Sequence, residues 1–266
     1  MLKYWFAGHL ALGLAQAALA ASVALVVMFI ARRRSIHLEK EISLALIRGI
    51  VQITAVGTVL VLLLRGPRWT GGLILLAMIF AAATISARRV RAIPHAWKVS
   101  LYGILAGAGS VIALMSLAGV IDSAITALVP VGSMLIANAM NANSVALERF
   151  RSDVQAHVGQ IEAALALGAV SQVSVFPYAQ ASFRASIIPA IDNLRSLGIV
   201  WIPGLMAGMV LSGSPPVYAA VYQFVVIAMI FSSSSLTCLV STSLVRQNVF
   251  SEADQLLLRS SMQIAQ

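Results

Sequence analysis

The sequence predicts an all-α, polytopic membrane protein with about seven transmembrane helices. Hydrophobic residues make up 60% of the 266 residues and charged residues only 10%, whereas a soluble domain has about 45–50% apolar and about 25% charged residues. The charged residues gather at the ends of long apolar runs, as topology signals do. We therefore expect one transmembrane domain over residues 1–266, without a separate soluble domain.

Seven apolar runs are candidate spans, because a helix needs about 20 apolar residues to cross a bilayer. They cover approximately residues 10–31, 44–64, 71–87, 99–120, 125–147, 197–211 and 217–245. The first run ends at Arg32-Arg33-Arg34, whereas a cleavable signal peptide carries its basic residues before the apolar core. We therefore expect a retained first helix.

The basic residues predict the orientation of these spans. Of the 18 Lys and Arg residues, only Lys3, Arg65 and Arg68 fall on the same side as the N-terminus, and the other 15 fall on the opposite side. Basic residues are enriched on the cytoplasmic side of membrane proteins. This distribution predicts a multi-pass protein of the plasma membrane (the bacterial inner membrane), with the N-terminus outside and the C-terminus in the cytoplasm.

Residues 148–196 form the largest predicted cytoplasmic piece, which we interpret as a docking segment for a partner protein. A helix is predicted from Val154 to Leu167, followed by a sharp turn at Gly168. A second helix is predicted from near Pro177 to Ile188. Two short helices around a glycine can seat in a groove of a partner, although an interfacial amphipathic hairpin has the same pattern.

The residues that bind ATP in phosphate-binding loops are absent from the sequence. No Gly-x-x-x-x-Gly-Lys-Ser/Thr motif occurs. ATP and Mg²⁺ would therefore be bound by a separate ATPase subunit, and this chain is predicted to be no enzyme and to hold no cofactor of its own. The single Cys238 and the four scattered His residues show no metal-ligand spacing, so the metal ligands stay undetermined.

Polar residues inside the predicted spans are candidates for a translocation pathway. Met134, Asn138 and Asn141 are spaced i, i+4 and i+7, which places them on one face of a helix. We predict that this face lines the pathway together with Gln52 and Gln223. The alternative is hydrogen bonding between helices for the amides and packing for the methionine.

Several stretches of the sequence carry a resemblance to a known family. They are Arg48 to Gln52, Val129 to Met134 with Asn138-Ala139-Met140, Leu167-Gly168-Ala169, Arg184 with Pro189 to Asp192, and Leu197 to Gly208. On these residues the chain resembles the FetB family of ABC-transporter permeases, described as iron exporters, with plant relatives linked to aluminium tolerance. One departure is Ala137, where the family pattern has Gly before Asn-Ala-Met.

The resemblance implies a permease subunit that exports iron, another metal ion or a metal-linked solute, driven by a separate ATPase. It also implies a homodimer of permeases with two ATPase subunits. The residues expected to couple to the ATPase are Glu162, Ala163, Ala164, Gly168 and Arg184. Two other functions remain open: a stand-alone secondary carrier or channel, and a membrane anchor for an ATPase. A coupled carrier would need an ionisable residue in mid-membrane, and no carboxylate falls inside the predicted spans.

Overall fold

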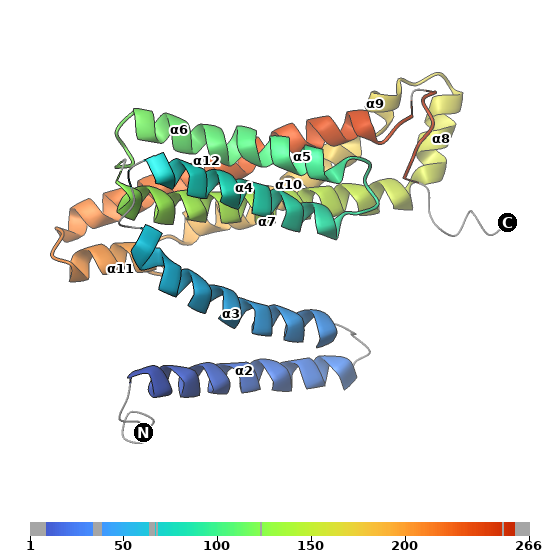
Figure 1. Cartoon of the computed structure of the whole chain (residues 1–266). Coiled ribbons are helices and arrows are strands. Elements are labelled where there is room, and N and C mark those ends of the chain that lie inside the picture. Colours follow the sequence, from blue (N-terminus) through green and yellow to red (C-terminus); the bar gives the residue numbers. More distant parts are fainter. Residues whose placement is uncertain are drawn as a thin grey trace. The chain divides into compact units, whose positions relative to one another are not determined.

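The computed structural model describes residues 9–33, 39–63, 67, 69–122, 124–251 and 253–258. These residues are helical almost throughout, and β-structure among them is limited to the isolated bridges Leu197–Trp201 and Phe250–Leu256. The chain divides into two compact units, Met1–Arg65 and Gly66–Gln266. The predicted all-α class is therefore confirmed (Figure 1).

The first unit contains two long helices that pack against each other, α2 (His9–Arg33) and α3 (Glu39–Leu63). They correspond to the first two predicted spans, and α2 ends at Arg32 and Arg33. Their large apolar side chains are mostly exposed. Exposed apolar surface on helices of this length is typical of segments that face lipid or another subunit.

The second unit is a helical bundle built around α7 and α12. Its elements are α4 (Trp69–Arg89), α5 (Ala96–Ile104), the π-helix η1 (Leu105–Gly109), α6 (Ser110–Leu117), α7 (Ile125–Ala156), α8 (Val158–Ala166), α9 (Ser171–Ser174), α10 (Phe176–Ser196), α11 (Gly204–Leu211) and α12 (Pro216–Asn248). Helices α7 and α12 lie side by side and run in the same direction, and α10 runs back along both of them (Figure 1). Helix α4 packs against α7 and α5, and α5 packs against both α7 and α12.

Five helical segments among the described residues are long and apolar enough to cross a membrane. They are Ala11–Ile30, Trp69–Arg89, Ala96–Leu117, Ile125–Ala156 and Pro216–Asn248, and a shorter apolar stretch, Ile42–Val56, lies in α3. Five of the seven predicted spans are thus found as apolar helices of sufficient length. The chain turns between α11, which ends at Leu211, and α12, which begins at Pro216.

The predicted sixth span at 197–211 is wrong as a continuous helix. Residues 197–203 are not helical, and α11 has only 8 residues, a length of roughly 12 Å at 1.5 Å per residue. The return path of the chain is instead made by α10 followed by α11 (Figure 1). Helix α10 has 21 residues and continues through Pro189, so it does not end at Ile188 as predicted. Its length of about 32 Å matches the hydrocarbon core of a bilayer.

Hydropathy missed α10 because charged residues interrupt it. Arg184, Asp192 and Arg195 all lie on this helix. Small residues instead make up its buried face, where Ala179, Ser182 and Ser186 are inaccessible. Small side chains let helix backbones approach closely in membrane bundles, so α10 packs against α7 and α12 without being strongly apolar.

The helix predicted from Val154 to Leu167 is divided in two. Helix α7 continues to Ala156, nine residues beyond the predicted end of its span, and His157 has non-helical dihedral angles of φ −120° and ψ 23°. Helix α8 then begins at Val158. The ring of Tyr178, from the first turns of α10, stacks on the His157 ring with centroids 5.0 Å apart. The break therefore lies against α10 and has a fixed place in the bundle.

Candidate functional site

The α8–α9 hairpin (residues 158–174) follows the end of α7 and is attached to the bundle by one face. Val158 and Ile161 are buried, and Leu165 packs against the same hydrophobic cluster, which also contains Phe150 of α7 and Val175 before α10. These hairpin residues are spaced i, i+3 and i+7, one face of a helix. Burial of apolar surface is favourable by about 25 cal/mol per Å², so this face attaches the hairpin to the bundle.

Gly168 forms the sharp turn that the sequence predicts. Its φ of +88° lies in the left-handed region, which glycine adopts without the steric cost of a Cβ. The Gly168 N–H donates to the Leu165 carbonyl (2.9 Å), and the Ala169 N–H donates to the Ala164 carbonyl (3.0 Å). This pair of hydrogen bonds is the Schellman arrangement that terminates helices, so the turn depends on the glycine.

Apolar side chains are exposed at the tip of the hairpin. Leu167 is 90% exposed, and Val170 and Val173 are 65% and 61% exposed. Large apolar residues gathered on a polar-rimmed surface mark sites of interaction with another protein or with lipid. The outer surface of the α8–α9 hairpin is therefore suited to contact an apolar groove.

Four of the five predicted ATPase-coupling residues lie on this hairpin. Ala163 and Gly168 are exposed, and Glu162 and Ala164 are partly buried. The fifth, Arg184, lies on α10, where it lines a pocket between α10 and α12. The structure therefore brings together the α8 residues and the turn, and it places Arg184 apart from them.

The C-terminal segment, residues 249–251 and 253–258, also contacts the hairpin and its hydrophobic cluster. The Ser171 hydroxyl donates to the Asp254 carboxylate, and Phe250 and Leu256 form an antiparallel bridge. Leu256 and Leu258 are buried in the same cluster as Ile161. Sequence reasoning missed this role, although the apolar run Leu256-Leu257-Leu258 gave a signal for it.

The three predicted pathway residues of α7 share an accessible face of that helix. Met134 is 36% exposed, Asn141 is exposed and Asn138 is half-buried. The Asn138 amide donates to the Met134 carbonyl (2.8 Å), which is a bond within the helix. Amide groups are unfavourable against hydrocarbon, so a membrane-embedded face of this kind needs water, a solute or another protein beside it.

The two predicted glutamines lie on other helices, Gln223 on α12 and Gln52 on α3. Gln223 of α12 is 1% exposed, and neither its amide nitrogen nor its oxygen has a partner in the described part of the chain. Gln52 is exposed on α3, in the first compact unit. Within the second unit, the three α7 residues share an accessible face and Gln223 is buried.

Asp192 is a carboxylate on α10, a helix that is long enough for a span although it is not among the five candidate spans. It is exposed on α10, a helix that packs against α7 and α12. The sequence prediction placed this residue in the cytoplasmic segment 148–196. The corrected course of α10 places it instead near the end that leads to α11.

A buried polar cluster, which sequence reasoning did not assemble, connects three helices. The Asn143 amide of α7 donates to the hydroxyls of Ser86 on α4 (2.8 Å) and Ser100 on α5 (3.0 Å). The Ser144 hydroxyl also donates to Ser86 (3.1 Å). All four residues are buried, so these hydrogen bonds satisfy donors that would otherwise be costly in an apolar interior, while the Asn143 Oδ1 has no partner in the described part of the chain.

A second contact that was missed joins α5 and η1 to α12 through glycines. A Cβ added at Gly107 would lie 2.6 Å from the Ser233 carbonyl oxygen and from the Thr237 nitrogen. A Cβ at Gly103 would collide with the Ser241 side chain. The signal was the Gly-x-x-x-Gly spacing of Gly103 and Gly107, which permits close helix approach in membranes.

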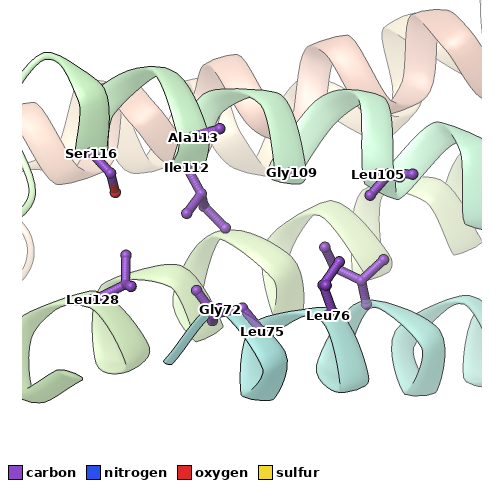
Figure 2. Close-up of a pocket in the computed structure, with 10 residues that line it drawn as sticks. Gly72, Leu75, Leu76, Leu105, Gly109, Ile112, Ala113, Ser116 and Leu128 are labelled. Carbon is purple, nitrogen blue, oxygen red and sulfur yellow. The ribbon is translucent and has the colours of Figure 1, made fainter. Parts of the chain in front are cut away.

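The described residues contain no group of three or more His, Cys, Asp or Glu side chains that could hold a metal ion. A pocket of about 350 Å³ lies between α4 and the η1–α6 segment, with Leu128 of α7 at one end (Figure 2). Its walls are apolar, and Ser116 is the one polar side chain among the described lining residues. Such a pocket has no ligands for a cation and suits hydrocarbon.

Comparisons with known proteins are consistent with a membrane-embedded chain. The profile of a family described as "Uncharacterised protein family (UPF0014)" matches residues 14–250. The chain is 30% identical over 242 residues to the "Probable iron export permease protein FetB" of Escherichia coli (strain K12), covering 91% of this chain and 93% of that protein.

Two plant proteins are also similar. "Protein ALUMINUM SENSITIVE 3" of Arabidopsis thaliana is 28% identical over 247 residues, covering 92% of this chain and 90% of that protein. "UPF0014 membrane protein STAR2" of Oryza sativa subsp. japonica is 30% identical over 243 residues, covering 89% of this chain and 84% of that protein. No solved structure matches the chain significantly.

Proposed function

The chain belongs to the UPF0014 family, and from this we propose that it is the permease subunit of an ABC transporter. The proposed transporter exports iron, another metal ion or a metal-linked solute, and a separate ATPase subunit drives it. The name of the bacterial relative, an iron export permease, supports the substrate class. We propose a bacterial inner-membrane protein whose N-terminus is outside and whose α8–α9 hairpin faces the cytoplasm.

The observation that carries this proposal is the α8–α9 hairpin. It is attached to the bundle by buried residues on one side and exposes Leu167, Val170 and Val173 on the other. A hairpin that only rested on the membrane surface would need no attachment to three parts of the bundle. The same geometry is what a partner ATPase requires to transmit its movement to the membrane helices.

In the proposed mechanism, ATP binding closes two ATPase subunits and moves the hairpins that are seated in them. Each hairpin shares its hydrophobic cluster with α7, the start of α10 and the C-terminal segment. A displacement of the hairpin is therefore passed to these elements as a rigid-body movement. ATP shifts the equilibrium between inward-open and outward-open states because it binds one of them more tightly.

We propose that two permease copies form the pathway, with the α7 face of Met134, Asn138 and Asn141 toward it. The support is that these residues are accessible in a single chain although lipid solvates amides poorly. Thioether and amide groups bind metal ions weakly compared with carboxylate or thiolate clusters. Weak sites suit a pathway from which the substrate must also leave.

A secondary carrier is the second candidate, and Asp192 is the observation that favours it. A carboxylate on a membrane-embedded helix can bind a proton or a coupling ion, and α10 carries one. A carrier, however, would have no use for an exposed apolar hairpin tip. The two functions differ in what drives transport, which can be measured directly.

The test is to reconstitute the chain in lipid vesicles with the ATPase that copurifies with it. We expect ATP hydrolysis to be stimulated by one or more ions from a panel of Fe²⁺, Mn²⁺, Zn²⁺ and Al³⁺, and the same ion to be transported. The control is the ATPase in vesicles without the chain. Transport at the same rate without ATP would identify a carrier, and an ATPase that no ion stimulates, together with no transport, would identify an anchor.

Replacing Asn138 with alanine is expected to lower transport about tenfold, the effect of losing one interaction of about 1.4 kcal/mol, with little change in melting temperature. The side chain bonds only within its own helix in the described structure, so its loss removes no link between helices. Ser133→Ala is the matched control, because Ser133 also bonds within α7, to the Pro130 carbonyl. A marked loss of stability with normal activity would make Asn138 a packing residue.

A further inference from the structure

A pocket of about 300 Å³ lies between the first half of α10 and the last turns of α12. This is the end of the bundle at which the α8–α9 hairpin lies (Figure 1). Arg184 and Gln180 line it from α10, and Arg246, Thr242 and Ser243 line it from α12. The function proposed above assigns this pocket no role.

The pocket is positively charged. Two guanidinium groups line it, and no carboxylate is among its described lining residues. Neither Arg184 nor Arg246 has an ion-pair partner within the residues that the structure describes. Arg246 is partly withdrawn from water, and an arginine in such a position usually has an anionic partner, so an anion in this pocket would satisfy it.

Arg246 is held in place but incompletely satisfied. Its guanidinium lies 4.7 Å from the centre of the Phe176 ring, a favourable cation–π distance. Its Nε is shielded from solvent and has no hydrogen-bond partner in the described part of the chain. Buried donors without partners are uncommon in native proteins and call for an explanation such as a bound ion.

The remaining polar groups leave the arginines as the main donors to a ligand. The Thr242 hydroxyl already donates to the Cys238 carbonyl (2.7 Å), and the Ser243 hydroxyl donates to the Leu239 carbonyl (2.8 Å). Donors to a ligand therefore come from Arg184, Arg246 and the Gln180 amide. The first turn of α10, which begins at Phe176, adds the positive end of a helix dipole.

We propose that this pocket binds a phosphate group, clamped between Arg184 and Arg246. Arginine recognises phosphate oxygens through paired N–H donors. The walls of the pocket favour the phosphate of an anionic phospholipid over free phosphate, because they also include Phe183 and Leu239. Leu239 is 50% exposed on the membrane helix α12 and can contact an acyl chain. Basic pockets between membrane helices bind lipid head groups in this way.

The test measures lipid binding to the purified full chain by native mass spectrometry, with phosphatidylglycerol as the anionic probe and phosphatidylcholine as the zwitterionic control. We expect specific binding of phosphatidylglycerol, weakened about tenfold or more by either Arg184→Gln or Arg246→Gln, since each removes a charge-assisted contact. Arg246→Lys, which keeps the charge, should retain part of the affinity. Arg91→Gln is the control, because Arg91 is an exposed arginine outside the pocket.

Inorganic phosphate distinguishes the two sources of the phosphate group. If millimolar phosphate displaces the lipid and its own binding also depends on both arginines, the pocket is a free-phosphate site. If phosphate does not compete, the occupant is the phospholipid. Unchanged phosphatidylglycerol and phosphate binding by both glutamine variants would overturn the proposal. Arg184 is exposed on its helix, so Arg184→Gln keeps the test decisive even if Arg246→Gln fails to fold.

Discussion

Replacing Gly107 with alanine is expected to destabilise the protein by about 2 kcal/mol or more, the upper range for overpacking a tight interior. A Cβ at this position would lie 2.6 Å from two backbone atoms of α12. Backbone atoms cannot rotate away as the end of a side chain can. Either α12 must shift away from η1, or the contact between η1 and α12 must open. The expected fall in melting temperature in detergent is roughly 4–8 °C.

Gly109→Ala is the matched control, because it alters the same π-helix two residues away. A Cβ at Gly109 would lie 3.3 Å from the Leu105 Cδ1 atom, the end of a flexible side chain on the same segment. Loss of a glycine also lowers the conformational entropy of the unfolded chain, so we expect Gly109→Ala to melt within a few degrees of the unaltered protein. Equal melting temperatures for Gly107→Ala and the unaltered protein would show that the helices do not pack as described.

The apolar spans could be predicted from the sequence because hydropathy reports directly on the lipid-facing surface. Helix α10 could not be predicted in this way. Its buried face consists of small residues such as Ser182 and Ser186, and its charged residues look like those of a cytoplasmic loop. Where small residues and shape complementarity stabilise a helix, packing with its neighbours determines its place, and hydropathy does not report on such packing.

The candidate site was also predictable only in part from the sequence. The turn at Gly168 was predictable because a left-handed backbone conformation requires a particular residue type. The attachment of the hairpin was not, because Ile161, Phe150 and Leu258 come together only in the folded bundle. The shared face of Met134, Asn138 and Asn141 followed from helical periodicity, but periodicity does not specify what that face contacts.

Gly168→Val is expected to abolish the stimulation of ATP hydrolysis by the transported ion while leaving the protein folded in the membrane. Gly168 has a φ of +88°, and a Cβ there would meet no atom within 4 Å. The substitution therefore acts through backbone strain alone, which costs about 1–3 kcal/mol for a residue other than glycine. The turn relieves this strain by changing its path, which displaces Leu167 and Val170 at the hairpin tip.

Gly159→Val is the control that separates backbone strain from the addition of a side chain. Gly159 is an exposed glycine in α8 on the same hairpin, and a Cβ there also meets no atom within 4 Å, but its φ is not in the left-handed region. Both variants add the same side chain to open space, so they differ in backbone strain. We expect Gly159→Val to keep ion-stimulated ATP hydrolysis and Gly168→Val to lose it, with Gly168→Asn intermediate because asparagine tolerates the left-handed conformation. If Gly168→Val and Gly159→Val are stimulated equally, the conformation of this turn does not couple the two subunits, and the exposed residues of α8 itself become the candidates for the contact.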